Sequence, residues 1–348
     1  MPVLTCDLLK LKKRVPLTIS RGTSTHGDIF WLRWEEEGVE GWGEGVPFAI
    51  DEHPQTLAML VDAFEKHRGW LEQTSGVDRL GIEQQLWARG APSAFIAAVN
   101  QALYDWLGKR CGIPVFHLLG LGRRPAGVTS VTVGIGTPES AVRRVHQWLE
   151  VGDVRAFKVK LGAPAGIEAD KAMFAAVKSA VPAGARLSVD ANGGWNLSAA
   201  IEMSRWLAGH AVDHIEQPLA AGKEDDLPAL QAASPLPVLV DESCRTITDI
   251  PKLAGRIAGI NIKLMKCGGL DGALRLIHTA RAHGLRILVG CYGSSTLGNT
   301  CGAVLAPLVD YLDLDSHLNL EADPFMGAVL KEGGLVSPRS PGFGVTRS

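Results

Sequence analysis

The sequence predicts an α/β fold in which parallel strands and helices alternate in a closed (β/α)8-type barrel, preceded by an α+β unit. The first observation is that eight short apolar runs rich in Val and Ile recur after residue 123, starting 22 to 30 residues apart. The second is that a segment with helical spacing follows each run, as in parallel sheets that are buried on both faces. The third is a change of texture, since residues 1–122 lack this repeat.

Residues 1–122 are expected to form the α+β unit. The runs "VLTCDLLKLK" and "DIFWLRWEEEGVEGWGEG" predict strands, the second with a turn at Glu37-Gly38, and a polar loop is expected at residues 18–27. Helical spacing begins near Pro54. The last predicted helix, "SAFIAAVNQALYDWLGKRCG", ends at Gly112, with Pro114 just beyond it.

The eight strand–helix units occupy residues 123–320. An open, doubly wound sheet is the alternative architecture, but no GxGxxG sequence opens a helix after the first strand. The predicted strands are "SVTVGIG" (130–136), "AFKVKLG" (156–162), "RLSVDAN" (186–192), "DHIEQPL" (213–219), "PVLVDES" (237–243), "GINIKLM" (259–265), "RILVGCY" (286–292) and "YLDLDS" (311–316).

Composition excludes several classes of protein. The net charge of −2 over 348 residues gives no electrostatic case for binding nucleic acid or an anionic membrane, and the basic run "KLKKR" (10–14) predicts a solvated edge. Six scattered cysteines without a CxxC pair indicate reduced thiols rather than a zinc site or a disulfide scaffold. No signal-peptide core is present, and no apolar run approaches the ~18 residues of a membrane span. We expect a cytoplasmic protein.

Polar residues stand at the carboxyl ends of the predicted strands, where the active sites of such barrels lie. Charge at the ends of six apolar strands is difficult to explain by packing alone. In strand order these residues are Lys158 and Lys160, Asp190 and Asn192, Glu216 and Gln217, Asp241 and Glu242, Lys263, and finally Asp313 and Asp315.

Each motif taken singly has a purely structural explanation. Two lysines two positions apart on a strand are usually exposed, and "VDAN" or "VDES" usually caps a helix. The pattern "LDLDS" is typical of an edge strand protected by charge. Lys266 is most simply a solvated charge. Only the joint arrangement favours function over these explanations.

The joint arrangement predicts proton transfer at carbon. Asp190, Glu216 and Asp241 follow three consecutive strands and form an oxygen-rich site suited to Mg²⁺, with Mn²⁺ as the alternative. Lys160 and Lys263 follow the second and sixth strands, so one amine faces each side of a substrate held over the metal. Such a pair can remove and return a proton beside a carboxylate. Lys158 is expected to lower the pKa of its neighbour on the same strand.

These motifs together resemble the enolase superfamily, in its muconate lactonizing enzyme subgroup. The resemblance implies a modified (β/α)7β barrel (residues 123–320) under a capping domain built from residues 1–122 and from a returning tail, residues 321–348. It also implies that Asp190, Glu216 and Asp241 bind Mg²⁺, that Lys160 and Lys263 are the acid/base pair, and that Lys158 assists. The residues that carry it are "KVK" (158–160), "VDANGGW" (189–195), "IEQPL" (215–219), "VDES" (240–243) and "INIKLMKCGG" (260–269).

The eighth strand indicates the substrate. Asp313 and Asp315 face the same way by strand alternation and would attract an ammonium group. This DxD resembles the dipeptide epimerases of the L-Ala-D/L-Glu type, where it holds the α-amino group. The implied function is a Mg²⁺-dependent epimerase that inverts the α-carbon of a dipeptide's second residue by 1,1-proton transfer between two lysines, through a metal-stabilised enediolate.

Several alternatives stay open. The same lysines and metal would serve an o-succinylbenzoate synthase or a muconate cycloisomerase, and a barrel that only binds a dipeptide or a metal is a third class. Arg21 is expected either to meet a substrate carboxylate or to pair with the capping-domain surface, and Ser294 to contact substrate. Residues 18–27 and 48–54 are expected to close over the ligand. The preferred dipeptide is left open, because "CYGSSTLG" (291–298) lacks the acidic residue associated with many L-Ala-D/L-Glu epimerases. Homo-oligomer formation is also left open.

Overall fold

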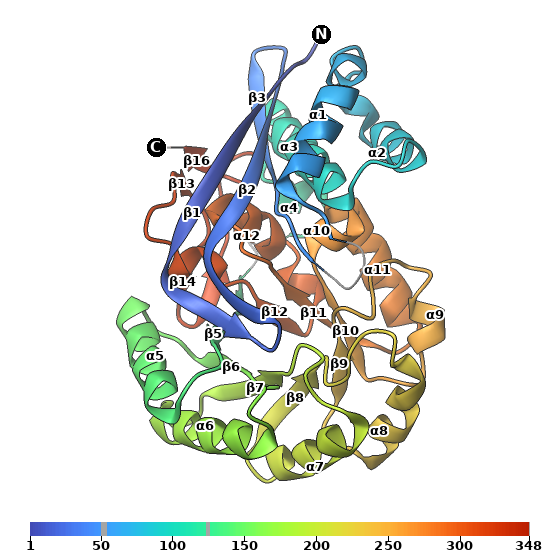
Figure 1. Ribbon diagram of the computed structural model, residues 1–348. Coiled ribbons are helices and arrows are strands. Elements are labelled where there is room, and N and C mark those ends of the chain that lie inside the picture. Colours follow the sequence, from blue (N-terminus) through green and yellow to red (C-terminus); the bar gives the residue numbers. More distant parts are fainter. Residues whose placement is uncertain (50–53, 123–125, 348) are drawn as a thin grey trace.

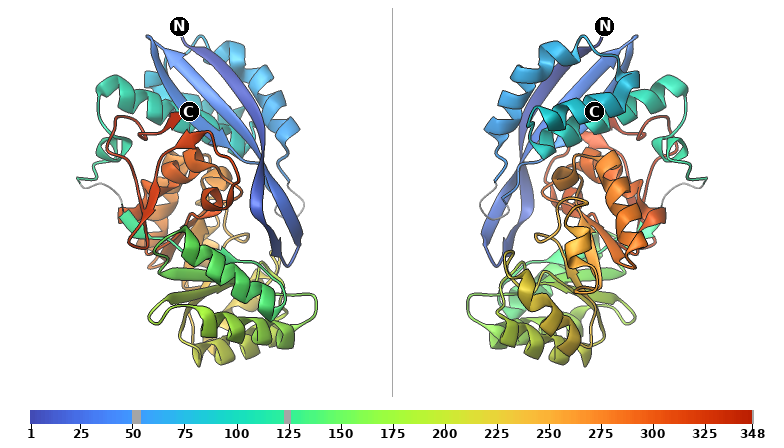
Figure 2. Two further views of the ribbon diagram at one scale, coloured as in Figure 1. Left: turned by 90° about the vertical axis from the view of Figure 1, so that its left-hand side faces the viewer. Right: turned by 90° about the vertical axis from the view of Figure 1, so that its right-hand side faces the viewer.

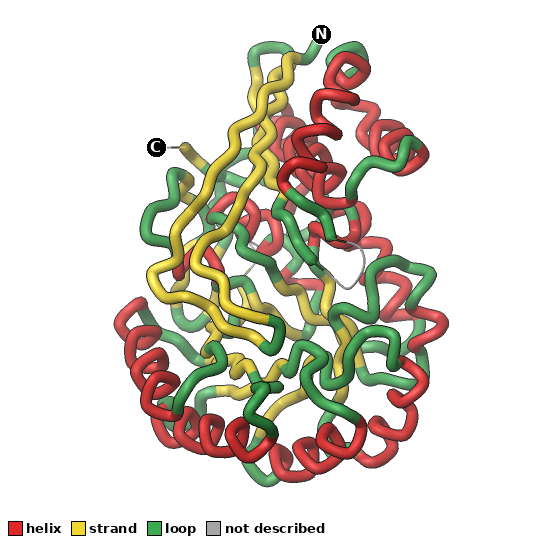
Figure 3. Tube along the Cα trace, in the orientation of Figure 1, coloured by secondary structure: helices red, strands yellow, loops and turns green. Residues whose placement is uncertain are grey.

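The computed structural model describes residues 1–49, 54–122 and 126–347. Eight parallel strands follow one another around a barrel in sequence order, from β5 to β12, with helices on the outside (Figure 1, Figure 3). The backbone N–H of Ser130 donates to Leu312 O at 3.0 Å, which joins the first strand to the last. The predicted closed α/β barrel is therefore confirmed, and the open sheet is excluded.

Each of the eight predicted runs coincides with one barrel strand, although β8 begins one residue before its run. The strands are shorter than the runs because the last residues of most runs turn into the loops. They are β5 (Val131–Val133), β6 (Ala156–Lys160), β7 (Arg186–Asp190), β8 (Val212–Glu216), β9 (Val238–Val240), β10 (Gly259–Ile262), β11 (Arg286–Gly290) and β12 (Tyr311–Asp313).

The outer layer is helical until the eighth strand. Instead of a helix, β12 is followed by the short 3-10 turn η4 (Ser316–Asn319), which agrees with the modified (β/α)7β form. The helices of this part are α5 (Pro138–Val151), α6 (Ile167–Ala180), α7 (Leu197–Ala208), α8 (Leu227–Ala233), α9 (Ile250–Leu253), α10 (Leu264–Cys267), α11 (Leu270–Ala282) and α12 (Thr296–Ala303), with 3-10 turns η2 (Glu224–Asp226) and η3 (Ala306–Leu308).

The N-terminal part forms a separate antiparallel sheet packed on helices. The strands β1 (Val3–Ile19), β2 (Gly22–Glu36) and β3 (Val39–Gly45) pair in that order. The helices are α1 (Leu57–Leu71), α2 (Arg79–Ala88), α3 (Ser93–Cys111) and α4 (Val115–Leu118), with a 3-10 turn η1 (Gly76–Asp78). Figure 2 shows the long β1–β2 hairpin extending from this domain down to the barrel.

The predicted polar loop at residues 18–27 is wrong. Ile19 pairs with Gly22, so the hairpin turns at Ser20-Arg21, and the flanking residues continue both strands. Thr18 and Thr23 face one another across the ladder with their hydroxyl oxygens 2.8 Å apart. Their polarity reflects an exposed strand pair, in which Thr is a favoured residue.

The C-terminal residues return to the N-terminal sheet in short strands. Phe325 packs edge-on against Trp31 and Trp42, with ring centroids 4.7 and 5.5 Å apart. These short strands are β13 (Phe325–Met326), which pairs with β16 (Thr346–Arg347), and β14 (Val329–Lys331), which pairs with β15 (Gly334–Val336). In addition, β15 pairs with β4 (Ala126–Val128), which precedes the first barrel strand.

Domain boundaries at residues 122 and 320 stay a prediction. Within the described ranges, no helix combines the length and the apolar character needed to cross a lipid bilayer.

Because β3 packs closely on α3, adding one methyl group to β3 is expected to destabilise the protein strongly. A Cβ on Gly43 would collide with the carbonyl oxygen of Ala98 and lie 2.6 Å from the amide nitrogen of Ala102. Since both are helix backbone, Gly43→Ala is expected to lower the free energy of unfolding by about 3 kcal/mol. Gly69→Ala is the control, because this exposed position in α1 has no atom within 4 Å of the added methyl. Urea denaturation measures both, and equal stabilities would contradict the packing argument.

A buried acid joins the N-terminal sheet to the barrel. Glu44 on β3 accepts hydrogen bonds from the indole N–H of Trp31 at 3.0 Å and from the backbone N–H of Ser295 at 3.1 Å. Burial raises the pKa of Glu44 to about 7, even though these hydrogen bonds favour its ionised form.

This raised pKa predicts a pH-dependent stability. Between pH 4.5 and 7 the folded protein holds more protons at Glu44 than the unfolded chain does, so stability falls as pH rises through this window and levels off above it. The loss due to Glu44 is about 3 kcal/mol. Urea denaturation from pH 5.5 to 8 should show the fall, and Glu44→Gln should make it shallower. An equally steep fall in the variant would contradict the assignment.

Candidate active site

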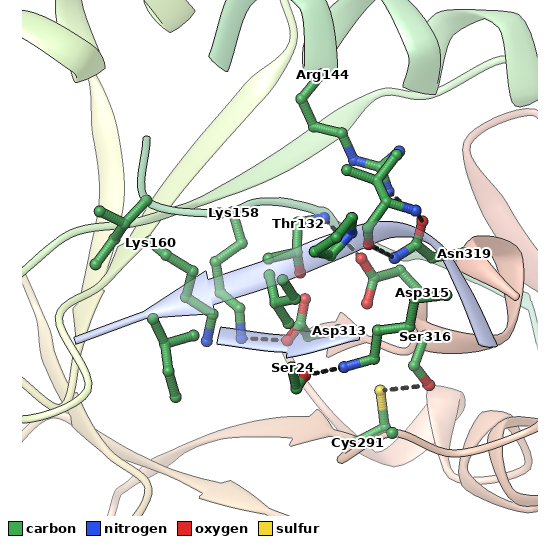
Figure 4. A pocket seen from close by; sticks show the side chains of 18 of the residues that line it. Ser24, Thr132, Arg144, Lys158, Lys160, Cys291, Asp313, Asp315, Ser316 and Asn319 are labelled. Atoms are coloured by element: carbon green, nitrogen blue, oxygen red, sulfur yellow. Dashed lines mark hydrogen bonds and ion pairs between the residues drawn. The ribbon is translucent and has the colours of Figure 1, made fainter. Parts of the chain in front are cut away.

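A cavity of about 350 Å³ lies between the carboxyl ends of the barrel strands and the β1–β2 hairpin (Figure 4). The strands supply Lys158 and Lys160 from β6 and Asp313 from β12. The hairpin supplies an apolar wall made of Val15, Pro16, Leu17 and Ile19. Both lysines of β6, Lys263 and the two aspartates of the eighth run therefore share one cavity with residues from the start of the chain, whereas the three acids predicted to bind metal are buried and do not line it.

The two lysines of β6 are buried and held by carboxylates. Lys160 Nζ lies 2.5 Å from Asp190 Oδ2. Lys158 Nζ lies 3.2 Å from Glu216 Oε2 and also pairs with Asp313. Strand alternation places both amines on the barrel interior, as expected. The acids offset the cost of burying two like charges on one face.

The three acids predicted to bind metal end neighbouring strands and are fully buried. Asp190 ends β7, Glu216 ends β8, and Asp241 directly follows β9. Burial, together with the nearby charges of Asp190 and Asp241, raises the pKa of Glu216 to about 7 against the opposing charge of Lys158. Burial also acts to raise the pKa of Asp241, but Lys263 and Lys266 hold it well below the usual range. The three acids are therefore close enough for their charges to interact.

Each of these three acids forms an ion pair with a lysine. Lys263 Nζ lies 2.6 Å from Asp241 Oδ2. Among the residues that the structure describes, no group of three or more His, Cys, Asp or Glu side chains is placed to enclose a metal ion. The chemistry of the donors nevertheless fits a hard dication, because they are all oxygens. Two further buried oxygens beside them, Glu242 Oε2 and Asn192 Oδ1, have no hydrogen-bond partner in the described ranges.

Lys266 is a functional-site residue that the sequence analysis misjudged. It is buried, and its Nζ lies 2.7 Å from Asp241 Oδ1 and donates to Cys244 O at 2.9 Å and Asn261 O at 3.0 Å. The expected solvated charge is wrong, because the short helix α10 starts directly after Lys263 and turns Lys266 back beneath Asp241. Its neighbours Leu264, Met265 and Cys267 are apolar and buried, and their apolar character is the sequence signal that could have indicated this.

Removing this lysine predicts a loss of stability. Lys266→Met keeps the length of the side chain but removes the donor to Asp241 Oδ1 and to three backbone carbonyls. We expect the free energy of unfolding to fall by about 3 kcal/mol. Lys252→Met on α9 is the control, because Lys252 is exposed, and it should change stability by less than ~0.5 kcal/mol. Urea denaturation compares them, and a Lys266→Met protein as stable as the control would contradict this role.

Arg21 reaches the barrel from the tip of the hairpin. Its Nη2 lies 2.8 Å from Glu242 Oε1, and its Nη1 donates to Asn192 O at 3.0 Å. The expected alternative of a pair with the capping-domain surface is wrong, because Arg21 lies on the far end of that domain and meets the loops after β7 and β9 instead. The predicted closing segment 18–27 is this hairpin end, whereas residues 50–53 of the other segment lie outside the described residues.

Ser294 lines a separate small hollow beside Lys263 rather than the main cavity. Tyr292, which the sequence analysis did not single out, lines the main cavity. Its ring centroid lies 4.2 Å from Lys263 Nζ, and its other contact is a parallel stack on Phe48. The contact of Ser294 with substrate stays a prediction.

Comparison with known proteins identifies the family. Residues 4–120 match the N-terminal domain of the mandelate racemase / muconate lactonizing enzyme family, and residues 140–348 match the family described as enolase C-terminal domain-like. The chain belongs to the enolase superfamily.

Relatives within this superfamily cover nearly the whole chain. A hydrophobic dipeptide epimerase from Roseobacter litoralis is 45% identical over 96% of both chains. Another from a Flavobacteria bacterium is 42% identical over 96% of this chain and 95% of that one. The crystal structure of a dipeptide epimerase from Enterococcus faecalis, complexed with Mg and L-Leu-L-Tyr, is 29% identical, covers 99% of each chain and has a TM-score of 0.92.

Asp313 and Asp315 lie in different electrostatic surroundings. Asp313 accepts a hydrogen bond from Ser130 Oγ at 2.5 Å and is neutralised by Lys158, whereas Asp315 accepts the backbone N–H of Thr132 at 2.7 Å. Burial raises the pKa of Asp315, and the charge of Asp313 adds to this. For Asp313 burial acts in the same direction, but Lys158 more than offsets it and lowers the pKa. Of the two, Asp315 is the carboxylate without an ion-pair partner in the described ranges.

The neighbouring acids favour the charged forms of Lys158 and Lys263. Burial lowers the pKa of Lys158, but Asp313, Glu216 and Asp190 more than offset it and hold the pKa well above its ordinary value. Lys263 behaves in the same way, chiefly because of Asp241. The acids therefore outweigh the mutual repulsion of amines that the sequence analysis considered. The effect of Lys158 on the pKa of Lys160 stays a prediction.

Proposed function

We propose that the chain is a Mg²⁺-dependent dipeptide epimerase that inverts the α-carbon of the second residue. One observation carries this proposal. Lys160 ends the second strand of the barrel, Lys263 follows the sixth, and both line the same cavity. Two amines that reach one space from opposite sides of a barrel suit the removal and return of a proton on opposite faces of one carbon. The named activities of the relatives from Roseobacter litoralis and Enterococcus faecalis support the substrate class.

Asp190, Glu216 and Asp241 would hold the cation. Bound Mg²⁺ supplies positive charge that stabilises the negative charge developing on the substrate carboxylate. With a cation bound, Asp190 and Asp241 would no longer hold Lys160 and Lys263, which they now contact at 2.5 and 2.6 Å. Either amine would then be free to act as the base.

The remaining side chains position the substrate. One lysine accepts the α-proton of the second residue, and the other donates a proton to the opposite face. Lys158 holds Asp313 and Glu216 in place and so fixes the floor of the cavity. Asp315, with Asp313, receives the α-ammonium group. Arg21, fixed by Glu242, lies where a carboxylate of the second residue can meet it.

The test is hydrogen exchange in D₂O with a library of L,L-dipeptides and Mg²⁺, read by mass spectrometry. We expect one deuterium at the α-carbon of the second residue, together with the appearance of the L,D epimer. An o-succinylbenzoate synthase or muconate cycloisomerase would exchange no dipeptide and would convert its own substrate, which has no amine. A protein that only binds would exchange none of these compounds. No exchange across the library defeats the proposal.

A further inference from the structure

Two positive charges in the cavity have no acidic partner. Six cationic side chains line it, and four of these form ion pairs with acids. The other two, Lys13 and Arg144, are half-buried and form no ion pair with any acid in the described ranges of the chain, although even partial burial makes an unpaired charge costly. The four pairs are Arg21–Glu242, Lys158–Glu216, Lys160–Asp190 and Lys263–Asp241.

The fold aims both side chains inward. On β1 the residues that alternate with the exposed positions face the cavity, so Lys13 points in while Lys12 points out and pairs with Glu321 at 2.8 Å. The expectation that "KLKKR" is wholly a solvated edge is therefore wrong for Lys13. On α5, Arg144 lies over the ring of Trp148, 3.9 Å from its centroid. These positions hold the two charges at the same end of the cavity.

The neighbours of these cations are neutral donors and acceptors, apart from Asp315. Lys13 donates to the hydroxyl of Ser24, and Arg144 donates to Asn319 Oδ1 at 2.9 Å (Figure 4). Burial lowers the pKa of Arg144 to about 10, against the charge of Asp315. Burial also lowers the pKa of Lys13, and the charge of Asp315 is again the largest opposing effect. Asp315 therefore lies near both cations.

The charges at this end balance only until a substrate binds. Lys13, Arg144 and Lys158 are three cations, and Asp313, Asp315 and Glu216, which pairs with Lys158, are three anions. A dipeptide bound through its α-ammonium group alone would add one positive charge. A carboxylate beside that ammonium group would restore the balance, and the planar guanidinium of Arg144 suits bidentate recognition of such a group.

We propose that Lys13 and Arg144 bind a carboxylate on the side chain of the dipeptide's first residue, so that substrates of the form L-Glu-L-Xaa or L-Asp-L-Xaa are preferred. The anion belongs to the first residue because both cations flank Asp315, which holds the α-ammonium group of that residue. This inference rests on the proposed function. It adds a charged first residue to the substrate class.

The experiment compares L-Glu-L-Ala with its neutral isostere L-Gln-L-Ala by α-hydrogen exchange in D₂O. We expect kcat/KM for L-Glu-L-Ala to be at least about tenfold higher. In Arg144→Met this ratio should fall to within about twofold of one, and in Lys13→Met it should fall in the same direction. The matched controls Arg143→Met and Lys12→Met remove exposed charges from the same elements and should keep the ratio of the parent protein.

The outcomes are distinct. A ratio at or below one in the parent protein overturns the inference and leaves the proposed function standing. A ratio that survives both Arg144→Met and Lys13→Met also overturns it, and two separate variants guard against the misfolding of either, which thermal unfolding detects. Faster exchange of N-succinyl-L-alanine than of L-Glu-L-Ala overturns it as well, because the anion would then be recognised without an ammonium group. If no dipeptide exchanges, the proposed function itself fails.

Discussion

Replacing either Lys160 or Lys263 with alanine is expected to lower kcat/KM for dipeptide epimerisation by at least about 10³-fold. Each amine lies within 2.6 Å of an acid at the floor of the cavity, and each is proposed to serve one face of the α-carbon. The loss should appear in kcat, since an acid or base acts in the transition state rather than in binding. Chiral chromatography of the product against time measures it.

The same two variants should differ in stereochemistry. With one lysine removed, the other still faces one side of the α-carbon, so slow exchange in D₂O should persist for only one of the L,L and L,D epimers. The epimer that exchanges should be opposite in the two variants. Lys252→Ala, at an exposed position on α9, is the control and should behave as the parent does. Exchange of the same epimer in both variants, or unchanged turnover in either, would refute the assignment of two opposed bases.

The barrel was predictable because its signals are local. A buried parallel strand is apolar throughout, and a charge at its end stands out against that background, as Lys160 does in "AFKVK" and Asp190 does in "RLSVD". The order of strands around a barrel follows the order in the sequence. The count of strands along the sequence therefore predicts that Lys160 and Lys263 lie on opposite sides of the barrel.

The features of the site that could not be predicted from the sequence depend on contacts between segments that are distant in the chain. Arg21 meets Glu242 only because a hairpin of the first domain reaches the barrel. Nothing near Lys13 in the sequence indicates that the hairpin turns its side chain into the cavity. The strands β13 and β16 are two residues long each, too short for any period to be visible. Lys266 was misjudged for a similar reason, because its partners come from other barrel loops.

Removing divalent cations is expected to abolish the activity. After treatment with EDTA and dialysis, exchange of the dipeptide α-hydrogen should fall by at least about 10³-fold and return on addition of Mg²⁺. The reason is electrostatic. Asp190, Glu216 and Asp241 are buried, and their lysine partners must be released before one of them can act as a base. A cation is the charge that can replace those amines at the acids.

Binding can be separated from turnover by stability. A ligand that binds only the folded state at about 100 times its Kd stabilises the protein by about 2.7 kcal/mol, so Mg²⁺ should raise the Tm of the metal-free protein. Glu216→Gln keeps the shape of the side chain and the acceptor for Asn261, but it removes one charge and should abolish both the rise in Tm and the activity. Glu168→Gln, at a position 81% exposed on α6, is the control. A Glu216→Gln protein that Mg²⁺ still stabilises would show that the cation binds elsewhere, because the cluster of three acids cannot hold it equally well with one charge missing.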